Sequence, residues 1–307
     1  MRLASFAKFV PEGRKTVAEI VTSSGASAAE AKAFGRLFGF DRVAVTDNTA
    51  SVADTFHHVL DTMMAADAAL PDTLIYVHGN PAQYDMTAHP VDALLASHPM
   101  LAQVQDWFEM DQQNCSTLFW GLDAAQRLLE GDARRVLVLA GDNLSQMPVD
   151  DRYAPGVTAI GDAYVGLMLD AEKGGTQIGD IFLKTHSDFY AGRFGTARQS
   201  ASFNATHGDL VREILDATDF DADSTAPILP HNVNRLSWTQ FSRETGMDRD
   251  RIWLDLLPDV GHCYTVDAAT MIDRFMTSVE QSAHLLSVGQ GGFLGGCKIT
   301  KEMATCK

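Results

Sequence analysis

The chain has 307 residues, of which 46% are hydrophobic and 21% are charged. These proportions are typical of a soluble globular protein, and the length is enough for one large domain or two. The formal net charge of −16 argues against nucleic acid or an anionic membrane as a partner, and no apolar stretch is long enough to span a bilayer.

The N-terminus and the cysteines indicate the compartment. Residues 1–15 are basic but have no long apolar core before a small-residue cleavage site, so we expect a first strand rather than a secretion signal. The four cysteines, Cys115, Cys263, Cys297 and Cys306, contain neither a C-x-x-C pair nor the spacing of a zinc site. We therefore expect a cytoplasmic protein with reduced thiols and no bound metal.

Strands and helices alternate along the sequence, which favours an α/β fold with mostly parallel sheets. The stretch 80–99 contains three prolines and is expected to be rich in loops. In chain order, the first half predicts a helix over 27–38, a helix over 52–69, a strand over 73–77, a short element over 101–108, a helix over 115–130, a strand over 135–141 and a strand over 159–169.

The second half repeats this alternation after Lys173-Gly174-Gly175. We place a boundary there, between an N-terminal half (1–172) and a C-terminal half (173–307), and we expect a long surface loop over 188–207. In chain order, the remaining pattern predicts a helix over 207–217, a strand over 226–229, a helix over 234–245, a strand over 252–256, a helix over 265–279 and a hairpin of 284–288 with 293–299.

Cys115 is the first candidate for chemistry. It precedes an amphipathic run that Gly131 ends, so it lies at or just before the start of a helix. Unpaired backbone N–H groups and the positive end of the helix dipole favour a thiolate at this position. A thiolate is a nucleophile, which makes Cys115 the candidate catalytic residue.

Two histidines are expected to join it. His231 and His262 each follow a short apolar segment and precede a predicted helix, and such loops gather ligands in α/β sheets. A cysteine and two histidines together are suited to acyl transfer. A single histidine there is more often a hydrogen-bonding turn residue, and either Asp259 or Asp267 is near enough in sequence to orient His262.

The order of these motifs resembles the ketoacyl-ACP synthase III branch of the thiolase superfamily, from about Trp107 to Cys297. The family's nucleophilic cysteine and the end of the strand that follows it correspond to Cys115 and Gly141-Asp142. Its glycine turn corresponds to Gly161-Asp162-Ala163, and its Pro-His-Gln-Ala-Asn motif to Pro230-His231-Asn232-Val233-Asn234. Its glycine-rich turn corresponds to Gly289-Gln290-Gly291-Gly292-Phe293.

The resemblance implies a thiolase fold, with two similar α/β halves in five layers, α-β-α-β-α. It implies that Cys115 accepts an acyl group from coenzyme A or acyl carrier protein, with His231 assisting and the backbone N–H groups of Cys115 and Gly291 as the oxyanion hole. Asn234 and Arg235 are expected to contact the substrate. The thioesters are substrates rather than permanent cofactors, no metal is implied, and the proteins of this family are typically homodimers.

The sequence departs from the family most clearly at His262, where the family usually has asparagine. A neutral imidazole can donate one hydrogen bond, as the amide does, and related elongating synthases use a Cys-His-His set. His262 can equally act as a base toward an alcohol or amine. The basic residues with which the family binds coenzyme A also have no one-to-one counterparts in this sequence. Six arginines are candidates for a basic patch: Arg36, Arg42, Arg152, Arg193, Arg198 and Arg235.

We therefore predict acyl transfer through a Cys115 thioester. The favoured reaction is a decarboxylative Claisen condensation with a malonyl-type unit in secondary metabolism. The alternative on the same fold is an ester- or amide-forming acyltransferase. Two further classes are a catalytically silent thiolase-fold partner subunit, which the presence of Cys115 and His231 argues against, and an unrelated cysteine hydrolase, which the motif order argues against.

Overall fold

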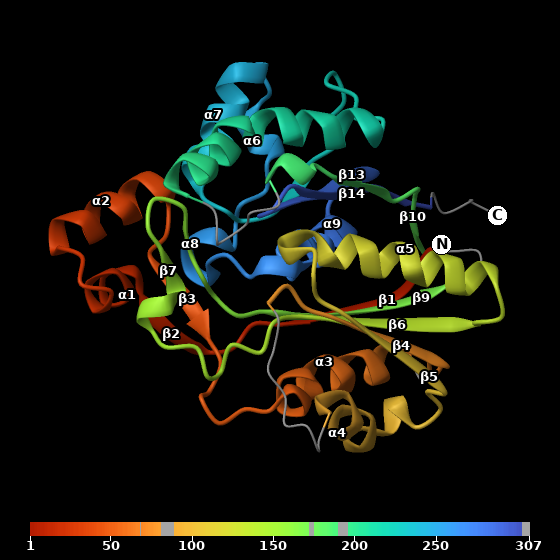
Figure 1. The fold of residues 1–307 in the computed structure, drawn as a ribbon. Helices are drawn as coiled ribbons and strands as arrows, with labels where there is room; N and C mark the ends of the chain where they lie inside the picture. The colour runs from red at the N-terminus through yellow and green to blue at the C-terminus, as the bar shows by residue number, and fades with distance from the viewer. Residues whose placement is uncertain (68, 81–88, 172–174, 190–195, 303–307) are drawn as a thin grey trace.

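The structure is a computed structural model, and it describes residues 1–67, 69–80, 89–171, 175–189 and 196–302. Within these residues, ten strands form one large mixed sheet, which folds into two layers with helices between and outside them (Figure 1). None of the described helices has both the length and the apolar character needed to cross a bilayer.

Five strands of the N-terminal half make the first layer. They are β1 (Arg2–Phe9), β4 (Thr73–Val77), β5 (Asp106–Met110), β6 (Arg135–Ala140) and β9 (Tyr164–Asp170). Across the layer they run in the order β5-β4-β6-β9-β1. Strand β4 is parallel to β5 and β6, whereas β9 is antiparallel to β6 and β1.

The C-terminal half repeats this arrangement. Its strands are β10 (Thr176–Ile178), β11 (Phe182–Thr185), β12 (Ile228–Pro230), β13 (Ser282–Gly289) and β14 (Phe293–Lys301). Strand β12 is parallel to β13, and β14 is antiparallel to β13, β10 and β11. A parallel bridge from Ile228 to Ile252 occupies the place that β5 takes beside β4. The predicted pair of similar α/β halves is confirmed by this shared strand order.

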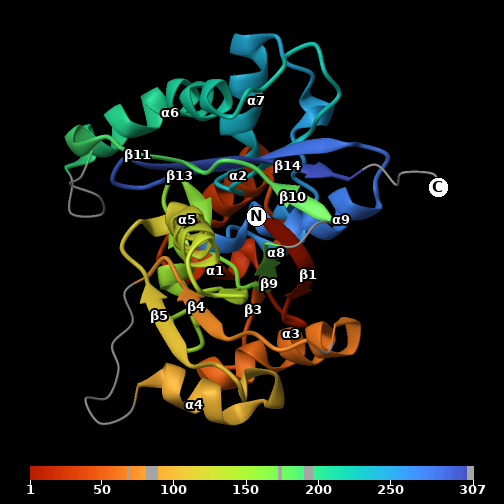
Figure 2. The ribbon, with the colours of Figure 1, turned by 90° about the vertical axis from the view of Figure 1, so that its right-hand side faces the viewer.

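The two layers join where β1 pairs antiparallel with β10 and Arg2 lies opposite Gln177. Helices α3 (Val52–Ala66) and α4 (Pro90–Ser97) cover the outside of the first layer, and α6 (Ala197–Ala217) and α7 (Arg235–Thr245) cover the outside of the second (Figures 1 and 2). Helices α5 (Thr117–Glu130) and α9 (Ile272–Thr277) lie between them. This is the predicted α-β-α-β-α order. The predicted boundary at residues 172 and 173 lies outside the described residues.

Helix α5 packs tightly against both layers. A Cβ on Gly121 in α5 would lie 2.7 Å from a methyl carbon of Val77 in β4. On the other side, a Cβ on Gly295 in β14 would lie 2.6 Å from the ring of Phe119 in α5. Glycine at these two places lets both sheets approach the helix. Because helices cover both faces of the strands, β9 is buried along its whole length, which explains its continuous apolar sequence.

A smaller group of elements borders one end of the layers. It consists of α1 (Val17–Ser23), α2 (Ala28–Phe38), β2 (Gly13–Thr16), β3 (Arg42–Val45), β7 (Tyr153–Ala154), β8 (Thr158–Ala159) and α8 (Leu257–Val260). The Phe34 ring of α2 stacks on Phe40 and meets Tyr153 edge-on. The helix predicted from residue 27 is confirmed, with the Ser27 side chain accepting from the Glu30 N–H.

Two stretches expected to be loops contain helices. Helix α4 begins at Pro90, since proline suits a first helical turn, and the His89 side chain caps it; residues 81–88 lie outside the described part. Helix α6 begins at Ala197 rather than at residue 207, after a capping box formed by Thr196 and Gln199. The polar composition of this first part concealed the helix.

Two predicted elements are shorter than expected. The helix over 265–279 is interrupted: two 3-10 turns, Tyr264–Val266 and Ala269–Met271, precede α9. Buried Asp267 and Thr270 lie within this segment, and the Asp267 carboxylate is bound by groups outside it. The strand over 252–256 is reduced to its bridge at Ile252.

Gly161 joins the smaller group to the segment that carries His262. Ile160 forms a parallel bridge with His262, and the Gly161 N–H donates to the His262 carbonyl oxygen at 3.0 Å. A Cβ on Gly161 would lie 1.8 Å from the carbonyl oxygen of Val260. Only glycine lets these two backbones meet, and the position of His262 depends on that meeting.

We expect Gly161→Ala to lower the free energy of unfolding by about 1–3 kcal/mol, because one backbone must move to admit the methyl group. Urea denaturation measures this change. Gly131→Ala is the matched control, since a Cβ there would come no nearer than 3.4 Å to its neighbours. Equal stability of the two variants would contradict the close approach at Gly161.

Candidate active site

Cys115 lies in a 3-10 turn, Asn114–Ser116, that leads directly into the 14-residue helix α5. Its side chain is buried, with 6% exposed. The hydroxyl of Ser116 donates to the carbonyl oxygens of Ser287 at 3.0 Å and Phe293 at 2.8 Å, which anchors the turn to β13 and β14. The predicted position at a helix start is confirmed, and the helix N-terminus favours a thiolate there.

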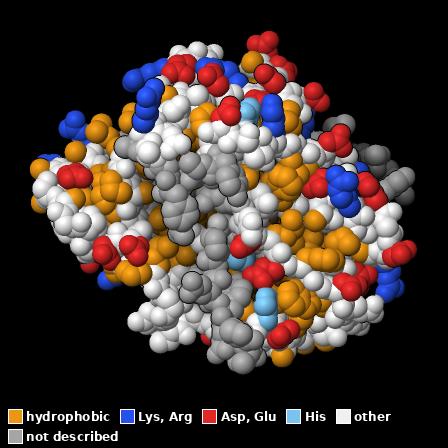
Figure 3. All heavy atoms as spheres, viewed as in Figure 1, with side chains coloured by type: hydrophobic (Ala, Val, Ile, Leu, Met, Phe, Trp, Pro, Cys, Tyr) orange, Lys and Arg blue, Asp and Glu red, His pale blue; other side chains and the backbone are white. Residues whose placement is uncertain are grey.

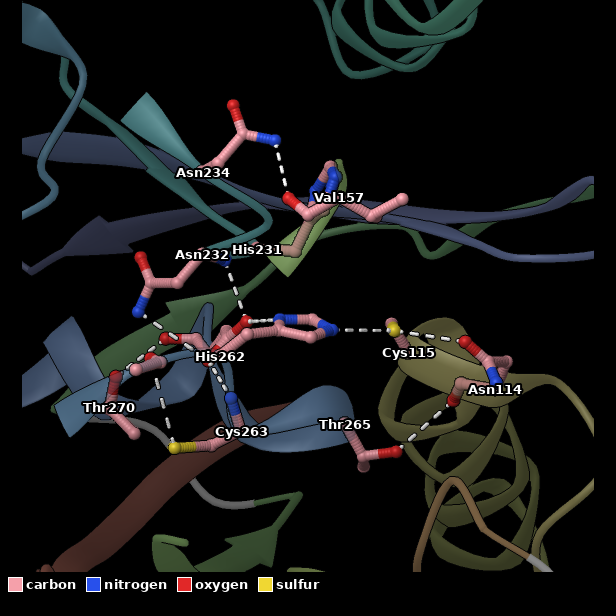
Figure 4. Close-up of polar contacts among 12 residues, drawn as sticks. Asn114, Cys115, Val157, His231, Asn232, Asn234, His262, Cys263, Thr265 and Thr270 are labelled. Carbon is pink, nitrogen blue, oxygen red and sulfur yellow. Dashed lines mark hydrogen bonds and ion pairs between the residues drawn. The ribbon is translucent and has the colours of Figure 1, made fainter. Parts of the chain in front are cut away.

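His262 lies between Cys115 and a buried carboxylate. Its Nε2 is 3.3 Å from the Cys115 Sγ, and its Nδ1 is 2.5 Å from Oδ2 of Asp267. Figure 4 shows the Cys115 and His262 side chains pointing toward each other. The Cys115 Sγ also donates to Oδ1 of Asn114 at 3.0 Å. A nucleophile, an imidazole and an orienting carboxylate thus lie in contact in that order, which is the arrangement of a catalytic triad.

Asp267 holds two loops together. Its carboxylate, almost fully buried, accepts the backbone N–H of Asn232 at 2.6 Å and that of Cys263 at 2.7 Å. The Asn232 side chain donates a third, longer bond of 3.4 Å. One carboxylate therefore fixes the loop after β12, the loop after α8 and the His262 ring at once.

The surroundings of His262 favour the charged form of its imidazole. Burial by itself lowers its pKa, but the Asp267 carboxylate and the Cys115 sulfur outweigh burial and raise the pKa well above its usual value. An imidazolium beside a cysteine stabilises the thiolate. The cavity therefore places an imidazole with a raised pKa directly against the Cys115 sulfur.

His231 has a different neighbour. Its Nε2 lies 3.0 Å from Nε2 of His207 in α6, and no hydrogen bond between His231 and Cys115 is found among the described residues. Burial lowers the pKa of His207 to about 4, and burial followed by His207 and His262 lowers that of His231 well below its usual value. Cys115, His231 and His262 thus line the same cavity, and the Cys-His-His set stays a prediction, since among the described residues the hydrogen bond to the cysteine comes from His262 and not from His231.

These residues line a cavity of about 610 Å³. Its walls combine apolar side chains such as Ile160 and Phe203 with uncharged polar ones such as Asn204 and Gln240. Among the described residues that line it, Asp188 is the only carboxylate and none is a lysine or arginine. Away from His262 and Asp188, the lining therefore suits an uncharged ligand.

Of the remaining predicted site residues, Gly291 and Asn234 line this cavity and Arg235 does not. Gly291 lines it together with Cys115, so the predicted oxyanion hole remains a prediction that the position permits. Asn234 also lines it, but its side chain caps α7 by accepting from Ser237 N–H and donates to the Val157 carbonyl oxygen (Figure 4). Arg235 does not line it; its guanidinium donates to the Arg36 carbonyl oxygen at 2.8 Å.

The predicted basic patch is only partly assembled. Arg152 is buried and forms a two-point ion pair with Asp162, at 2.8 and 3.1 Å. Arg42 pairs with Asp259, so Asp259 does not orient His262. Lys32, Arg36 and Arg235 line a second depression, between α2 and the start of α7. Arg193 lies outside the described residues. Acidic side chains are spread over the molecular face of Figure 3, as the net charge requires.

One group of side chains in the described part of the chain has the spacing of metal ligands: His57, Asp61 and His98. However, Nδ1 of His98 accepts a hydrogen bond from the Met100 N–H at 3.1 Å, so its Nε2 must carry the proton that it shares with Asp61. A metal would need the lone pair of that nitrogen. The donor set therefore fits a hydrogen-bonded histidine better than a metal ligand.

No protein-family model and no curated protein matches the sequence. Solved structures do match. The acyltransferase ChlB3 has a TM-score of 0.79 at 18% identity, with 98% of this chain and 97% of that chain covered. The chain has the thiolase fold. A 3-oxoacyl-(acyl-carrier protein) synthase from Burkholderia xenovorans has a TM-score of 0.78 at 19% identity, with coverage of 98% and 93%.

A third thiolase-fold structure, OleA from Xanthomonas campestris with cerulenin bound, has a TM-score of 0.78 at 13% identity, with coverage of 97% and 98%. These identities are low, so the comparison concerns the fold. The resemblance inferred from four ordered motifs is confirmed at that level, and over nearly the whole chain rather than from residue 107 onward.

The sequence does not point to His207 as a residue of the cavity, because nothing in its local sequence links it to His231. Asp267 had been one of two candidates for orienting His262, and the structure selects it. Gln199, Phe203 and His207 follow one another at intervals of four residues, which is the spacing of one helix face. This spacing could have indicated that one face of α6 lines the cavity.

We expect Asp267→Asn to slow the alkylation of Cys115 by iodoacetamide at pH 6 by about tenfold or more, the equivalent of one pKa unit. The carboxylate raises the pKa of His262, so its loss lets the imidazolium deprotonate at lower pH and removes the partner of the thiolate. Measuring the rate from pH 5 to 9, with peptide mapping to separate Cys115 from the other thiols, tests this.

Asp259→Asn is the matched control, because that carboxylate lies near in sequence but pairs with Arg14 and Arg42. Its pH profile should follow the wild type. Coincident profiles for Asp267→Asn and the wild type would show that Asp267 does not set the charge of His262.

Proposed function

We propose that this protein is an acyltransferase that carries the acyl group on Cys115 and passes it to a hydroxyl or amine. The observation that supports this most strongly is the contact series from Cys115 through His262 to Asp267 within a cavity. The series provides a nucleophile together with a group that can release and take up a proton.

In the first step the Cys115 thiolate attacks the carbonyl carbon of a thioester donor. A carbon–sulfur bond to Cys115 forms, and the bond to the donor sulfur breaks. The departing thiolate takes the proton from Nε2 of the His262 imidazolium, 3.3 Å from the Cys115 Sγ. His262 is then neutral and Cys115 carries the acyl group.

In the second step an alcohol or amine approaches the acyl group. Nε2 of His262 takes its proton as the oxygen or nitrogen attacks the carbonyl carbon. The bond to the Cys115 sulfur breaks, which regenerates the thiolate beside an imidazolium. One donor and one acceptor are consumed, and an ester or amide and a free thiol are formed.

The hydrogen bond to Asp267 favours this reaction over condensation. Asp267 accepts from Nδ1 of His262 at 2.5 Å, so the neutral ring keeps its proton on Nδ1 and presents a bare Nε2 to the cavity. A bare nitrogen accepts a proton but cannot stabilise an enolate, as the amide of an asparagine would. The change from asparagine to histidine thus converts a hydrogen-bond donor into a base.

Decarboxylative condensation, which the sequence favoured, is the second candidate. His231 lines the same cavity as Cys115 and His262, as in a Cys-His-His set. In that reaction the malonyl carboxylate leaves as carbon dioxide and the resulting enolate attacks the acyl group on Cys115. Stabilising that enolate requires two hydrogen-bond donors that face the thioester oxygen. Nε2 of His231, however, is already hydrogen-bonded to Nε2 of His207.

The comparisons support acyl transfer without choosing between these reactions, since both an acyltransferase and a 3-oxoacyl-(acyl-carrier protein) synthase share the fold. We propose acyl-coenzyme A or an acyl carrier protein as the donor. Its charged part would stay outside the cavity, whose described lining contains no lysine or arginine, and would lie beside Lys32, Arg36 and Arg235 in the neighbouring depression. Arg235 would then contact the donor, as the sequence predicted.

Intact-protein mass spectrometry after incubation with acetyl-, butyryl-, octanoyl- and malonyl-coenzyme A and the corresponding carrier-protein thioesters tests the first step. We expect a mass gain that Cys115→Ser abolishes. Cys263→Ser should retain it, because burial raises the pKa of that thiol well above its usual value. Absence of both an adduct and thioester hydrolysis would favour a silent partner subunit.

The second step is tested by adding 1-propanol, propylamine or malonyl-coenzyme A to the acylated protein. We expect ester or amide and no carbon dioxide. His262→Asn places the family's usual residue here; it should still form the adduct, though more slowly, and should transfer about 10²-fold more slowly, the usual loss of a general base. Release of carbon dioxide with a 3-ketoacyl product would establish condensation instead.

A further inference from the structure

His207 and His231 form a pair with a defined hydrogen-bond direction. Their Nε2 atoms are 3.0 Å apart, and both rings are uncharged at neutral pH because burial lowers both pKa values. Two neutral imidazoles can share this contact only if one Nε2 carries a proton and the other is bare. Which of the two Nε2 atoms carries the shared proton therefore determines whether Nδ1 of His207 can donate a hydrogen bond to a ligand.

The surroundings of His231 indicate the direction. Its Nδ1 is buried and has no hydrogen-bond partner among the described residues. Buried N–H groups without a partner are rare in proteins, so the favourable state of this nitrogen is the bare one. His231 then carries its proton on Nε2 and donates it to Nε2 of His207. The His207 ring must consequently be protonated on Nδ1.

The Nδ1–H of His207 is available to a ligand. The half-buried ring lines the cavity, and in the described part of the chain no side chain or backbone group is hydrogen-bonded to this nitrogen. The ring is held edge-on by Trp238 at 5.4 Å between centroids, and the Trp238 Nε1–H is fixed by the His231 carbonyl oxygen at 3.0 Å. His207, rather than His231, thus offers a free polar atom at this wall.

Uncharged polar side chains line the cavity from the two helices next to His207, together with apolar Phe203 and Leu236. Ser202 and Asn204 line the cavity from α6, and Ser237 and Gln240 line it from the facing part of α7. Hydroxyl and amide groups both donate and accept hydrogen bonds, so this wall is complementary to a ligand that carries several oxygens without a charge.

We propose that His207 binds the acceptor: its Nδ1–H donates a hydrogen bond to an oxygen of an uncharged molecule that bears hydroxyl groups, and His231 holds the ring in this orientation. The inference rests on the proposed acyl transfer and names the acceptor class for the same cavity. His262 takes the proton of the reacting hydroxyl, while the His207–His231 pair keeps its own proton throughout. His231 is accordingly a positioning residue.

The first experiment does not require acylation. Long-range ¹H–¹⁵N NMR of the labelled protein reports which ring nitrogen of each histidine carries the proton, with assignment by His207→Gln. We expect Nδ1–H for His207 and Nε2–H for His231, and a shift of the His207 signals with 1,2-propanediol as the probe. In His231→Phe the His207 ring loses its donor and should populate both tautomers. An Nε2–H tautomer of His207 in the wild type, or no shift with the diol, would overturn the proposal.

The second experiment measures transfer from the acylated protein to 1,2-propanediol. His207→Phe keeps a ring of similar size but no N–H, and it should slow transfer about tenfold, the value of one hydrogen bond. His207→Gln keeps a donor and should stay within about threefold of the wild type. Formation of the Cys115 adduct should be unchanged in both, and His57→Phe, a variant on α3, should match the wild type.

The two failures are distinguishable. If no donor acylates Cys115, the proposed function fails, while the tautomer measurement still tests His207. If Cys115 is acylated but His207→Phe and His207→Gln transfer equally fast or equally slowly, the hydrogen bond from His207 is not used, and the inference fails while the proposed function stands.

Discussion

The buried Asp267 carboxylate is the constraint on which the site depends. It accepts the backbone N–H of Asn232 from the loop after β12, the backbone N–H of Cys263 and the Nδ1–H of His262. A buried carboxylate is tolerated only when such donors surround it, so the three groups and the charge stabilise one another. Without it, the two histidine-bearing loops and the Nδ1–H of His262 would lose the carboxylate that joins them.

The cavity is divided by charge as a result. On one side, Asp267 and Cys115 keep His262 protonated; on the other, burial keeps the His207–His231 pair neutral. His231 lies between these groups, and the charge on His262 contributes to its low pKa. His262 thus differs in protonation from His207 and His231, because its ring is hydrogen-bonded to a carboxylate whereas theirs are hydrogen-bonded to each other. That difference separates proton transfer, at His262, from hydrogen bonding to a ligand, at His207.

The fold supplies the rigid frame for this division. Both halves repeat one strand order, and α5 packs against both layers through Gly121 and Gly295. Cys115 therefore begins a helix that is held from two sides, while Gly161 brings the His262 segment against the smaller group of elements. The reacting groups sit on turns, but each turn is anchored to the frame: the Cys115 turn through Ser116 to β13 and β14, and His262 through its bridge to Ile160. A site built in this way is fixed before a ligand arrives.

The sequence by itself determined the α/β class, most strands and the long apolar helices, because continuous apolar runs and helical periodicity report burial directly. It also determined that Cys115 begins a helix and that His231 and His262 follow strands or short elements. Only the tertiary structure decided which side chains touch. Asp267 rather than Asp259 orients His262, and His231 is hydrogen-bonded to His207. Arg152 forms an ion pair with Asp162. The reason is that local sequence fixes backbone conformation, whereas partners far apart in the chain are chosen by packing and by the need of every buried polar group for a hydrogen bond. The polar start of α6, which brings His207 to the cavity, is helical because of its capping box and its neighbours rather than any apolar pattern of its own.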